Sequence, residues 1–158
     1  MKKIIYILRG TAITCFFVLS SLSFSQNVSL DSTFHFDGKV STAVGDSNAY
    51  AYAVAIQPDG KILTIGTGFN GKNQDFIICR YKTNGDLDSS FNTIGTRLLD
   101  FGNYSDEAKA IAIQPDGKIL VVGFSYKIDT SYFAVARLNT DGSLDNSFDY
   151  DGKLTTGF

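Results

Sequence analysis

The chain has 158 residues, of which 44% are hydrophobic and 19% charged, and its formal net charge is −2. This length suits one domain of ordinary size. A mildly acidic chain without a basic patch argues against a nucleic-acid partner, because phosphate neutralisation needs clustered Lys and Arg.

Residues 1–25 are typical of a secretory signal peptide. A basic start leads into an apolar run at 11–20, and small residues close the segment, with Ser23 and Ser25 at the positions that signal peptidase prefers. The run is shorter than the ~20 apolar residues of a membrane span. We therefore expect cleavage before Gln26, a secreted or cell-surface location, and no membrane insertion of the mature chain.

Removal of this segment changes the charge and the cysteine content. The basic residues Lys2, Lys3 and Arg9 are lost, which leaves eleven basic residues against sixteen acidic ones. Cys79 is then the only cysteine, so no internal disulfide can form and stability must come from packing. Because Cys79 lies in an apolar, strand-like run, we expect a buried small hydrophobe rather than a reactive nucleophile.

The rest of the chain matches itself at a shift of 57 residues. The letters AIQPDGKIL stand at residues 55–63 and again at 112–120, and the motif LDSTF at 30–34 is followed by LDSSF at 87–91 and LDNSF at 144–148. No gap is needed. A fixed period predicts a supersecondary unit that stacks on copies of itself.

The period divides the mature chain into three parts. A partial repeat covers residues 26–48, a first full repeat covers 49–105, and a second full repeat covers 106–158. Each full repeat contains four runs rich in Ile, Val, Phe, Tyr and Thr, without helical periodicity. These runs are residues 51–57, 61–67, 75–82 and 96–101 in the first repeat, and 108–114, 118–124, 132–139 and 153–158 in the second.

The sequence therefore predicts an all-β fold. We expect two tandem four-stranded antiparallel sheets of the propeller-blade type. A partial N-terminal strand is expected at 39–44, which matches the fourth run of a repeat.

Turn residues and side-chain alternation refine this prediction. Residues 57–60 (QPDG) place Pro second and Gly fourth, which favours a tight turn that closes a hairpin. Alternation predicts Ala51, Ala53 and Ala55 on one face of the first run and larger side chains on the other. We expect two sheets to approach closely at this alanine face. The alanine strand should be innermost and the fourth strand outermost.

At these residues the sequence resembles the delta-60 repeat family, a bacterial β-propeller-like repeat. The motifs that carry the resemblance are AIQPDGKIL, DFIICRYKTNGDLDSSF and YFAVARLNTDGSLDNSF, and they cover the chain from about residue 30 onward. The resemblance implies the architecture and an exported location, commonly in large surface or secreted proteins. It implies no catalytic residue.

The number of repeats is small for a closed ring, which usually takes 4–8 blades. Three explanations are open. The chain is the front of a longer propeller, which we favour, or several copies assemble through their open blade faces, or the two blades stand as a marginal open stack.

Two motifs that invite a catalytic or nucleotide-binding interpretation have structural explanations. Residues 66–71 spell GxGxxG, but a strand-like run follows instead of the helix that a dinucleotide site needs, so we expect a hairpin loop. His35 is the only histidine and lies near Asp31, Ser32 and Asp37. Because the repeat replaces it by Asn92 and Asp149, we expect a solvated turn residue rather than a general base.

The acidic links at 139–145 and 149–152 resemble calcium-binding loops. They lack the glutamate that completes such a loop, and turn capping by Asp and Asn side chains explains them equally well. Calcium binding at these turns is left open.

Charged and aromatic residues at matching positions suggest structural roles. Arg80 and Arg137 should form ion pairs with Asp88 and Asp145, because an unpaired buried charge costs several kcal/mol. The loops that differ most between the repeats carry aromatic residues that could contact a glycan or a peptide, although plain packing explains them as well. These residues are Phe69, Tyr104, Tyr126 and Tyr132.

We predict no catalytic, cofactor-binding or metal-binding residue, because the polar residues that break the repeat, His35, Asn73 and Glu107, are scattered. The predicted function is a non-catalytic structural or interaction module of an exported repeat protein, with an unidentified protein or glycan partner. A glycan- or peptide-binding propeller is the alternative, although Lys109 at the position of Tyr52 breaks the expected one aromatic per blade. A secreted hydrolase on a propeller scaffold is a further alternative.

Overall fold

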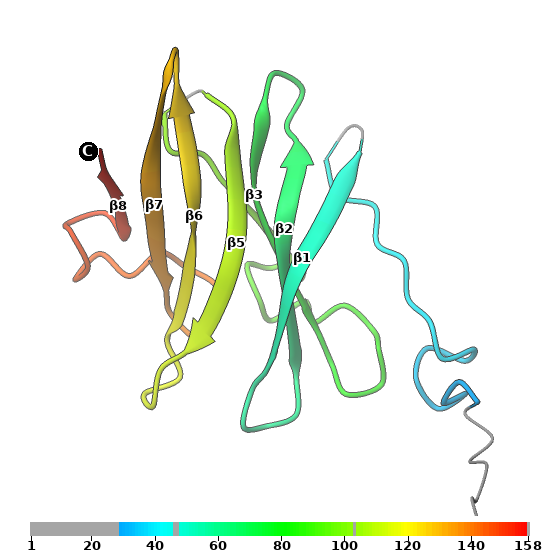
Figure 1. The fold of residues 1–158 in the computed structure, drawn as a ribbon. Helices are drawn as coiled ribbons and strands as arrows, with labels where there is room; N and C mark the ends of the chain where they lie inside the picture. Colours follow the sequence, from blue (N-terminus) through cyan, green and yellow to red (C-terminus); the bar gives the residue numbers. More distant parts are fainter. Residues whose placement is uncertain (1–28, 46–47, 103, 158) are drawn as a thin grey trace, which may run out of the picture.

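The computed structural model describes residues 29–45, 48–102 and 104–157. The signal peptide predicted at 1–25 lies outside these residues. The described part contains two four-stranded antiparallel sheets, and in each sheet the spatial order of the strands follows the chain order (Figure 1). The first sheet consists of β1 (Ala49–Ile56), β2 (Ile62–Phe69), β3 (Gln74–Tyr81) and β4 (Thr96–Leu99), and the second of β5 (Asp106–Ile113), β6 (Ile119–Lys127), β7 (Thr130–Leu138) and β8 (Lys153–Thr156).

This arrangement confirms the all-β prediction and all eight strands of the two full repeats. Within the described ranges there is no helix of the length and apolar character needed to cross a bilayer. The predicted hairpin turn is also confirmed, because the Gly60 amide donates to the Gln57 carbonyl at 2.8 Å. Gly60 adopts a φ of +82°, a left-handed conformation that glycine tolerates best.

A β-bulge changes which alanines share a face. The register shifts between Ala51 and Ala53 in β1, and between Ala108 and Ala110 in β5. A bulge inserts one extra residue, so the alternation of side chains reverses across it. The expectation that the alanines of this strand share one face is therefore wrong: Ala108 is fully buried in the core, whereas Ala110 is exposed.

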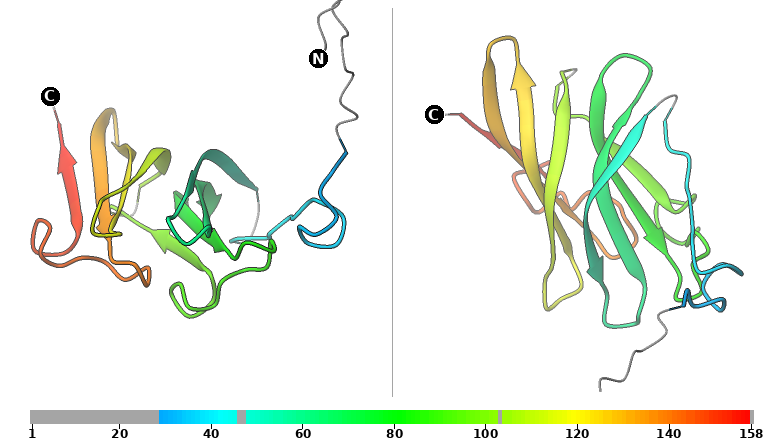
Figure 2. Two further views of the ribbon diagram at one scale, coloured as in Figure 1. Left: turned by 90° about the horizontal axis from the view of Figure 1, so that it is seen from below. Right: turned by 45° about the vertical axis from the view of Figure 1, so that its right-hand side comes forward.

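The two sheets stack face to face, and the main core lies between them (Figure 2). We call the surfaces that meet here the packed faces. The packed face of the first sheet contains Leu63, Ile65, Phe76 and Ile78, and that of the second contains Ile119, Val121, Ala134, Ala136 and Leu138. Ala53, from the alanine face predicted for β1, and the larger Ile111 of β5 both pack against this core.

Hydrogen bonds between the sheets fix their relative position. The Thr67 hydroxyl of β2 donates to the Asp106 carbonyl of β5 at 2.7 Å. Arg80 of β3 donates to the Thr140 carbonyl in the second repeat, and its guanidinium lies 4.8 Å from the centre of the fully buried Phe91 ring. The contact between the sheets thus combines apolar packing with hydrogen bonds.

Residues 39–44 form no strand, in contrast to the prediction. Val40 and Val44 instead pack against Cys79 and Tyr81 of β3, and the Tyr81 hydroxyl donates to Thr42 at 2.9 Å. The physical reason is that residues 39–44 have no neighbouring strand among the described residues with which to form hydrogen bonds. The matching strands β4 and β8 each pair with a third strand, β3 and β7, and the described residues offer no such strand beside 39–44.

Candidate functional site

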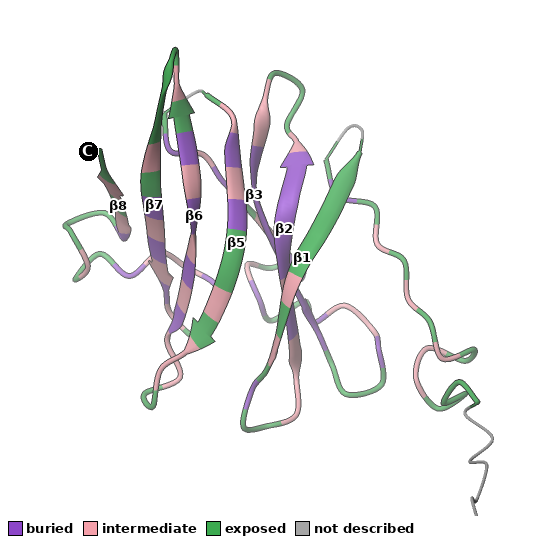
Figure 3. Cartoon of the chain, viewed as in Figure 1, coloured by how far each residue is buried: buried purple, intermediate pink, exposed green. Residues whose placement is uncertain are grey.

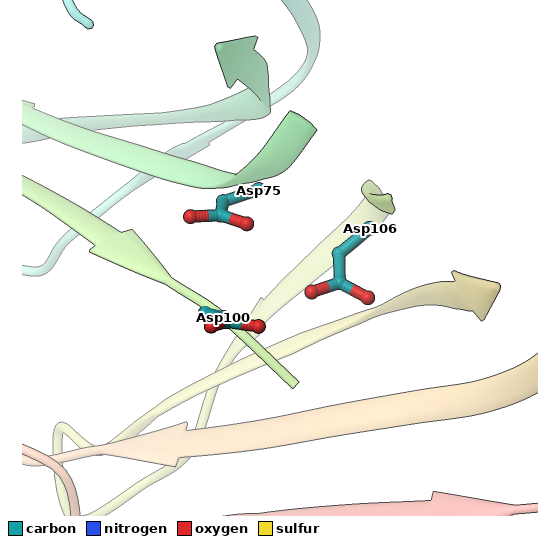
Figure 4. A group of neighbouring side chains, drawn as sticks. All are labelled: Asp75, Asp100 and Asp106. Atoms are coloured by element: carbon teal, nitrogen blue, oxygen red, sulfur yellow. The ribbon is translucent and has the colours of Figure 1, made fainter. Parts of the chain in front are cut away.

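Three aspartates meet at one end of the stack, where the chain passes from the first sheet to the second. Asp75 belongs to β3, Asp100 follows the last residue of β4, and Asp106 is the first residue of β5. Each offers a carboxylate oxygen, and these oxygens all lie within 4.8 Å of one another. Figure 4 shows the three carboxylates gathered between the ribbons of these elements.

The sheet topology brings these residues together. Because β3 and β4 are antiparallel, Phe76 near the start of β3 pairs with Leu99 at the end of β4. Their neighbours Asp75 and Asp100 therefore lie at the same end of the first sheet. The short link after Asp100 then leads directly to Asp106, at the start of the second sheet.

Each buried carboxylate is only half satisfied. The Asn70 side-chain amide donates to Asp75 Oδ2 at 2.7 Å, and the Phe101 amide donates to Asp106 Oδ2 at 2.8 Å. The other oxygen of each group, Oδ1, is buried and has no hydrogen-bond partner. Asp75 is 3% exposed and Asp106 is 0% exposed, so solvent does not satisfy these acceptors, and each unmet group costs about 1–3 kcal/mol.

A buried hydroxyl borders the same place. Ser125 of β6 pairs with Asp106 across the sheet, so both side chains lie on one face. Ser125 is fully buried, and its hydroxyl lies close enough to Asp106 to lower the pKa of that carboxyl as a hydrogen-bond donor. The site therefore combines three carboxylates with one polar hydroxyl.

The electrostatics of the site disfavour the ionised form. Burial raises the pKa of Asp75, and the nearby charges of Asp100 and Asp106 raise it further, against the hydrogen bond from Asn70. Burial likewise raises the pKa of Asp106, against hydrogen bonds from Ser125 and the Phe101 amide. Carboxylates gathered in this way can share a proton or hold a cation.

These three aspartates break the repeat. Their counterparts one period away are Tyr132 for Asp75, Gly157 for Asp100 and Ala49 for Asp106. Sequence reasoning missed this group, because it considered only His35, Asn73 and Glu107 as the polar residues that break the repeat. A comparison of every acidic position with its counterpart would have flagged all three, together with others such as Asp86 and Asp129.

The residues that the sequence singled out lie apart from this group. His35 Nδ1 lies 3.7 Å from Asp86, and its amide donates to the Asn84 carbonyl. Asp31 accepts hydrogen bonds from Thr33. His35 is thus held in a turn, as predicted, and does not pair with Asp31.

The other two unique polar residues also have local partners. Glu107 forms an ion pair with Lys109 at 2.6 Å, and the Asn73 side-chain amide donates to the Tyr104 carbonyl. In the GxGxxG segment, Gly66 and Gly68 belong to β2, and a hairpin leads to β3. A Cβ on Gly66 would come within 1.7 Å of the Tyr50 carbonyl oxygen, so this glycine allows close strand packing.

The two predicted arginine–aspartate pairs are confirmed. Arg80 Nε lies 2.9 Å from Asp88 Oδ2, and Arg137 Nε lies 2.6 Å from Asp145 Oδ2. Burial raises the pKa of Asp88, but hydrogen bonds from Ser90 and the charges of Arg80 and Lys61 outweigh it and bring the pKa to about 2. The pairs therefore stabilise the repeat and form no reactive site.

The acidic links use their oxygens to cap turns. Asp141 Oδ1 accepts from both the amide and the hydroxyl of Ser143, and Asp151 Oδ1 accepts from the Lys153 amide. Among the aromatic candidates in the loops, Tyr104 and Tyr126 are exposed, whereas the Tyr132 ring lies under the Lys127 ammonium at 4.9 Å.

Each sheet also has a second face that the other sheet does not cover. We call these the open faces; that of the first sheet contains Val54, Ile56, Ile62, Thr64, Ile77, Cys79 and Tyr81, and that of the second contains Leu120, Val122, Phe124, Phe133 and Val135. The exposed part of β1 is visible in Figure 3. A groove of about 310 Å³ runs between the first open face and residues 40–44.

Comparisons with known proteins support the architecture. Residues 57–91 and 114–148 each match the model of a family described as a domain of unknown function (DUF5122) with a β-propeller. No curated protein and no solved structure gives a significant match. The two matched segments occupy the same place in their repeats, so the chain contains β-propeller-like repeats, a fold that suits a structural or interaction module. The finer resemblance to the delta-60 family stays a prediction.

Proposed function

We propose that the chain is a non-catalytic structural or interaction module of an exported repeat protein, and that it works by docking its open faces onto other copies of itself. The observation that carries the proposal is the equivalence of the open and packed faces. Export rests on the signal peptide predicted at residues 1–25.

The open faces contain the same positions as the packed faces, one period apart. Val54 and Ile56 are 63% and 70% exposed, whereas their counterparts Ile111 and Ile113 are partly buried against the core. Phe133 is 47% exposed, whereas its counterpart Phe76 is fully buried. Each open face is therefore the unused half of an interface that the chain already makes once.

Residues 30–38 dock on the first sheet as residues 87–95 dock on the second. The His35 amide donates to the Asn84 carbonyl at 2.8 Å, and the Asn92 amide donates to the Asp141 carbonyl at 2.8 Å. Phe34 lies against Gly85, as Phe91 lies against Gly142. The N-terminal segment thus matches the end of a repeat, and the described residues place no first three strands of that repeat beside it.

Asp31 also differs from its counterparts, because no described arginine pairs with it. Its counterparts Asp88 and Asp145 each pair with an arginine of their own sheet, Arg80 and Arg137. Asp31 is exposed and accepts hydrogen bonds from Thr33. A third strand with an arginine at the matching position would complete the segment.

The second sheet of another copy has the required features. Its open face presents Phe133 and Val135 at the positions of Phe76 and Ile78, and β7 carries Arg137. Its outer strand β8 has four residues and is partly exposed. In the assembly we propose, residues 39–44 of one copy pair with β7 of the next in place of β8, and Asp31 takes the place of Asp145 as the partner of Arg137. The contact is head-to-tail, because it joins two different surfaces.

The test uses one variant for each face. Val54→Asp together with Ile56→Asp blocks the first open face, and Phe133→Asp blocks the second. All three side chains are exposed in the single chain, so the fold should persist. The molar mass of the wild type should rise with concentration in sedimentation velocity, whereas each variant alone should stay monomeric.

Mixing the two variants sharpens the test. Each retains the face that the other has lost, so an equimolar mixture should form a heterodimer and nothing larger. Ile94→Asp is the matched control, because Ile94 is 64% exposed outside both faces and its counterparts are Asp37 and Asp151. A wild type that is monomeric at every concentration, or folded variants that do not pair, would contradict the proposal.

A further inference from the structure

We infer that Asp75, Asp100 and Asp106 bind a calcium ion that links the first sheet to the second. Asp75 lies in the first sheet and Asp106 in the second, so a shared cation would connect them directly. This site is separate from the acidic links at 139–145 and 149–152, and it does not depend on the docking of copies.

The unmet hydrogen-bonding capacity of the site is the first argument. Asp75 Oδ1 and Asp106 Oδ1 are buried without a partner, while the second oxygen of each carboxylate is already used. Buried polar atoms normally have partners, so two such atoms in one cluster indicate a missing ligand.

Charge is the second argument. The donors that hold the Asp75 and Asp106 carboxylates are neutral, a side-chain amide and a backbone amide. The Lys153 ammonium lies close by, but it donates to the Asp100 backbone carbonyl at 3.0 Å. A proton shared between two carboxylates would neutralise one charge only, whereas a divalent cation balances two and coordinates the orphaned oxygens.

The ligand chemistry favours calcium. All candidate ligands are oxygens, which suit hard cations, and no nitrogen or sulfur ligand belongs to the group. Calcium accepts six to eight oxygens at about 2.3–2.6 Å in flexible geometry, so carboxylates within 4.8 Å of one another can share it. Asp100 is only half-buried, which leaves space for water to complete the coordination.

The first experiment measures calcium binding by the wild-type chain. After treatment with EDTA, thermal unfolding is followed by circular dichroism while calcium chloride is added, and isothermal titration gives the stoichiometry. We expect one calcium ion per chain. The unfolding midpoint should rise by about 10 °C when calcium is a hundredfold above its dissociation constant.

Variants separate a cation from a shared proton. Asp75→Asn with Asp106→Asn keeps the shape of the site and should abolish calcium binding and the calcium-dependent rise. Asp129→Asn, an exposed change at the tip of the β6–β7 hairpin, should leave both unchanged. If the wild type binds no calcium and the double variant simply unfolds at a higher temperature in EDTA, the carboxylates share a proton and the inference is wrong.

Discussion

The two sheets have nearly the same sequence pattern but bury opposite sides of it. The first sheet buries Phe76 and Ile78 and leaves Val54 and Ile56 exposed, whereas the second sheet partly buries the counterparts of the exposed residues and exposes Phe133, the counterpart of Phe76. The difference arises from neighbours and not from composition. A repeat position therefore acquires its energetic role only when another sheet lies against it.

The largest expected effect comes from truncating the same aromatic position in each sheet. Phe76→Ala removes a fully buried ring that packs against Phe101 at a centroid distance of 4.9 Å, and it should lower the free energy of unfolding by about 3–5 kcal/mol. Phe133→Ala removes a half-exposed ring and should cost less than about 1.5 kcal/mol. Urea denaturation at low protein concentration measures both.

Equal losses of unfolding free energy for Phe76→Ala and Phe133→Ala would contradict the contrast between the two sheets, because they would place Phe133 in a buried interface even in the single chain. A smaller loss of unfolding free energy for Phe133→Ala that grows with protein concentration would support the contrast further. The added cost would then report the docking of copies.

A smaller contrast is expected between the two arginines. The Arg80 side chain is 5% exposed, contacts the second repeat at Thr140 and covers the Phe91 ring, whereas the Arg137 side chain is 21% exposed. Removing one partner of a buried pair costs about 3–5 kcal/mol, and an exposed pair contributes about 0–1 kcal/mol. Arg80→Ala should therefore destabilise the chain by about 3 kcal/mol and Arg137→Ala by about 1 kcal/mol.

The measurement is again urea denaturation, with Arg137→Ala as the internal reference. Two variants of equal stability would show that the contact with Thr140 adds nothing. The equivalence of β3 and β7 would then extend to their ion pairs.

The strands could be predicted because their signals are local. Alternating apolar residues and the turns at 57–60 and 114–117 act within a few residues, and the sequence places all eight strands correctly. The bulge after Ala51 could not be predicted, because register depends on the neighbouring strand. Residues 39–44 have the pattern of a strand but lack a partner edge, and no local pattern reports that absence.

The candidate site was missed for a related reason. Asp75 is distant in the sequence from Asp100 and Asp106, and the three match no ligand motif, so a search for fixed spacings passes over them. Their convergence depends on the pairing of β3 with β4 and on the short link to β5. The ion pairs of Arg80 and Arg137 could be predicted, in contrast, because each acidic partner stands at a fixed distance along the same repeat.

The smallest expected effect concerns acid and compares two equivalent aspartates, Asp88 and Asp31. The folded pKa of Asp88 is about 2, below its ordinary value of 3.8. Between these two pH values the unfolded chain binds more protons than the folded chain, so this contribution to stability falls as the pH drops. It is fully present above about pH 5, and it is lost as the pH passes down through about 2.

Asp88→Asn should therefore flatten the decline of the urea midpoint between pH 5 and pH 2, whereas Asp31→Asn should leave its slope nearly unchanged. Hydrogen bonds from Thr33 also lower the pKa of Asp31, but this side chain is fully exposed and has no arginine beside it among the described residues, so solvent screens its contribution. Suppose that Asp31→Asn flattens the pH profile of the urea midpoint as strongly as Asp88→Asn, and more so at high protein concentration. Asp31 then forms an ion pair with the arginine of another copy. The acid profile would in that case distinguish the single chain from the assembled one.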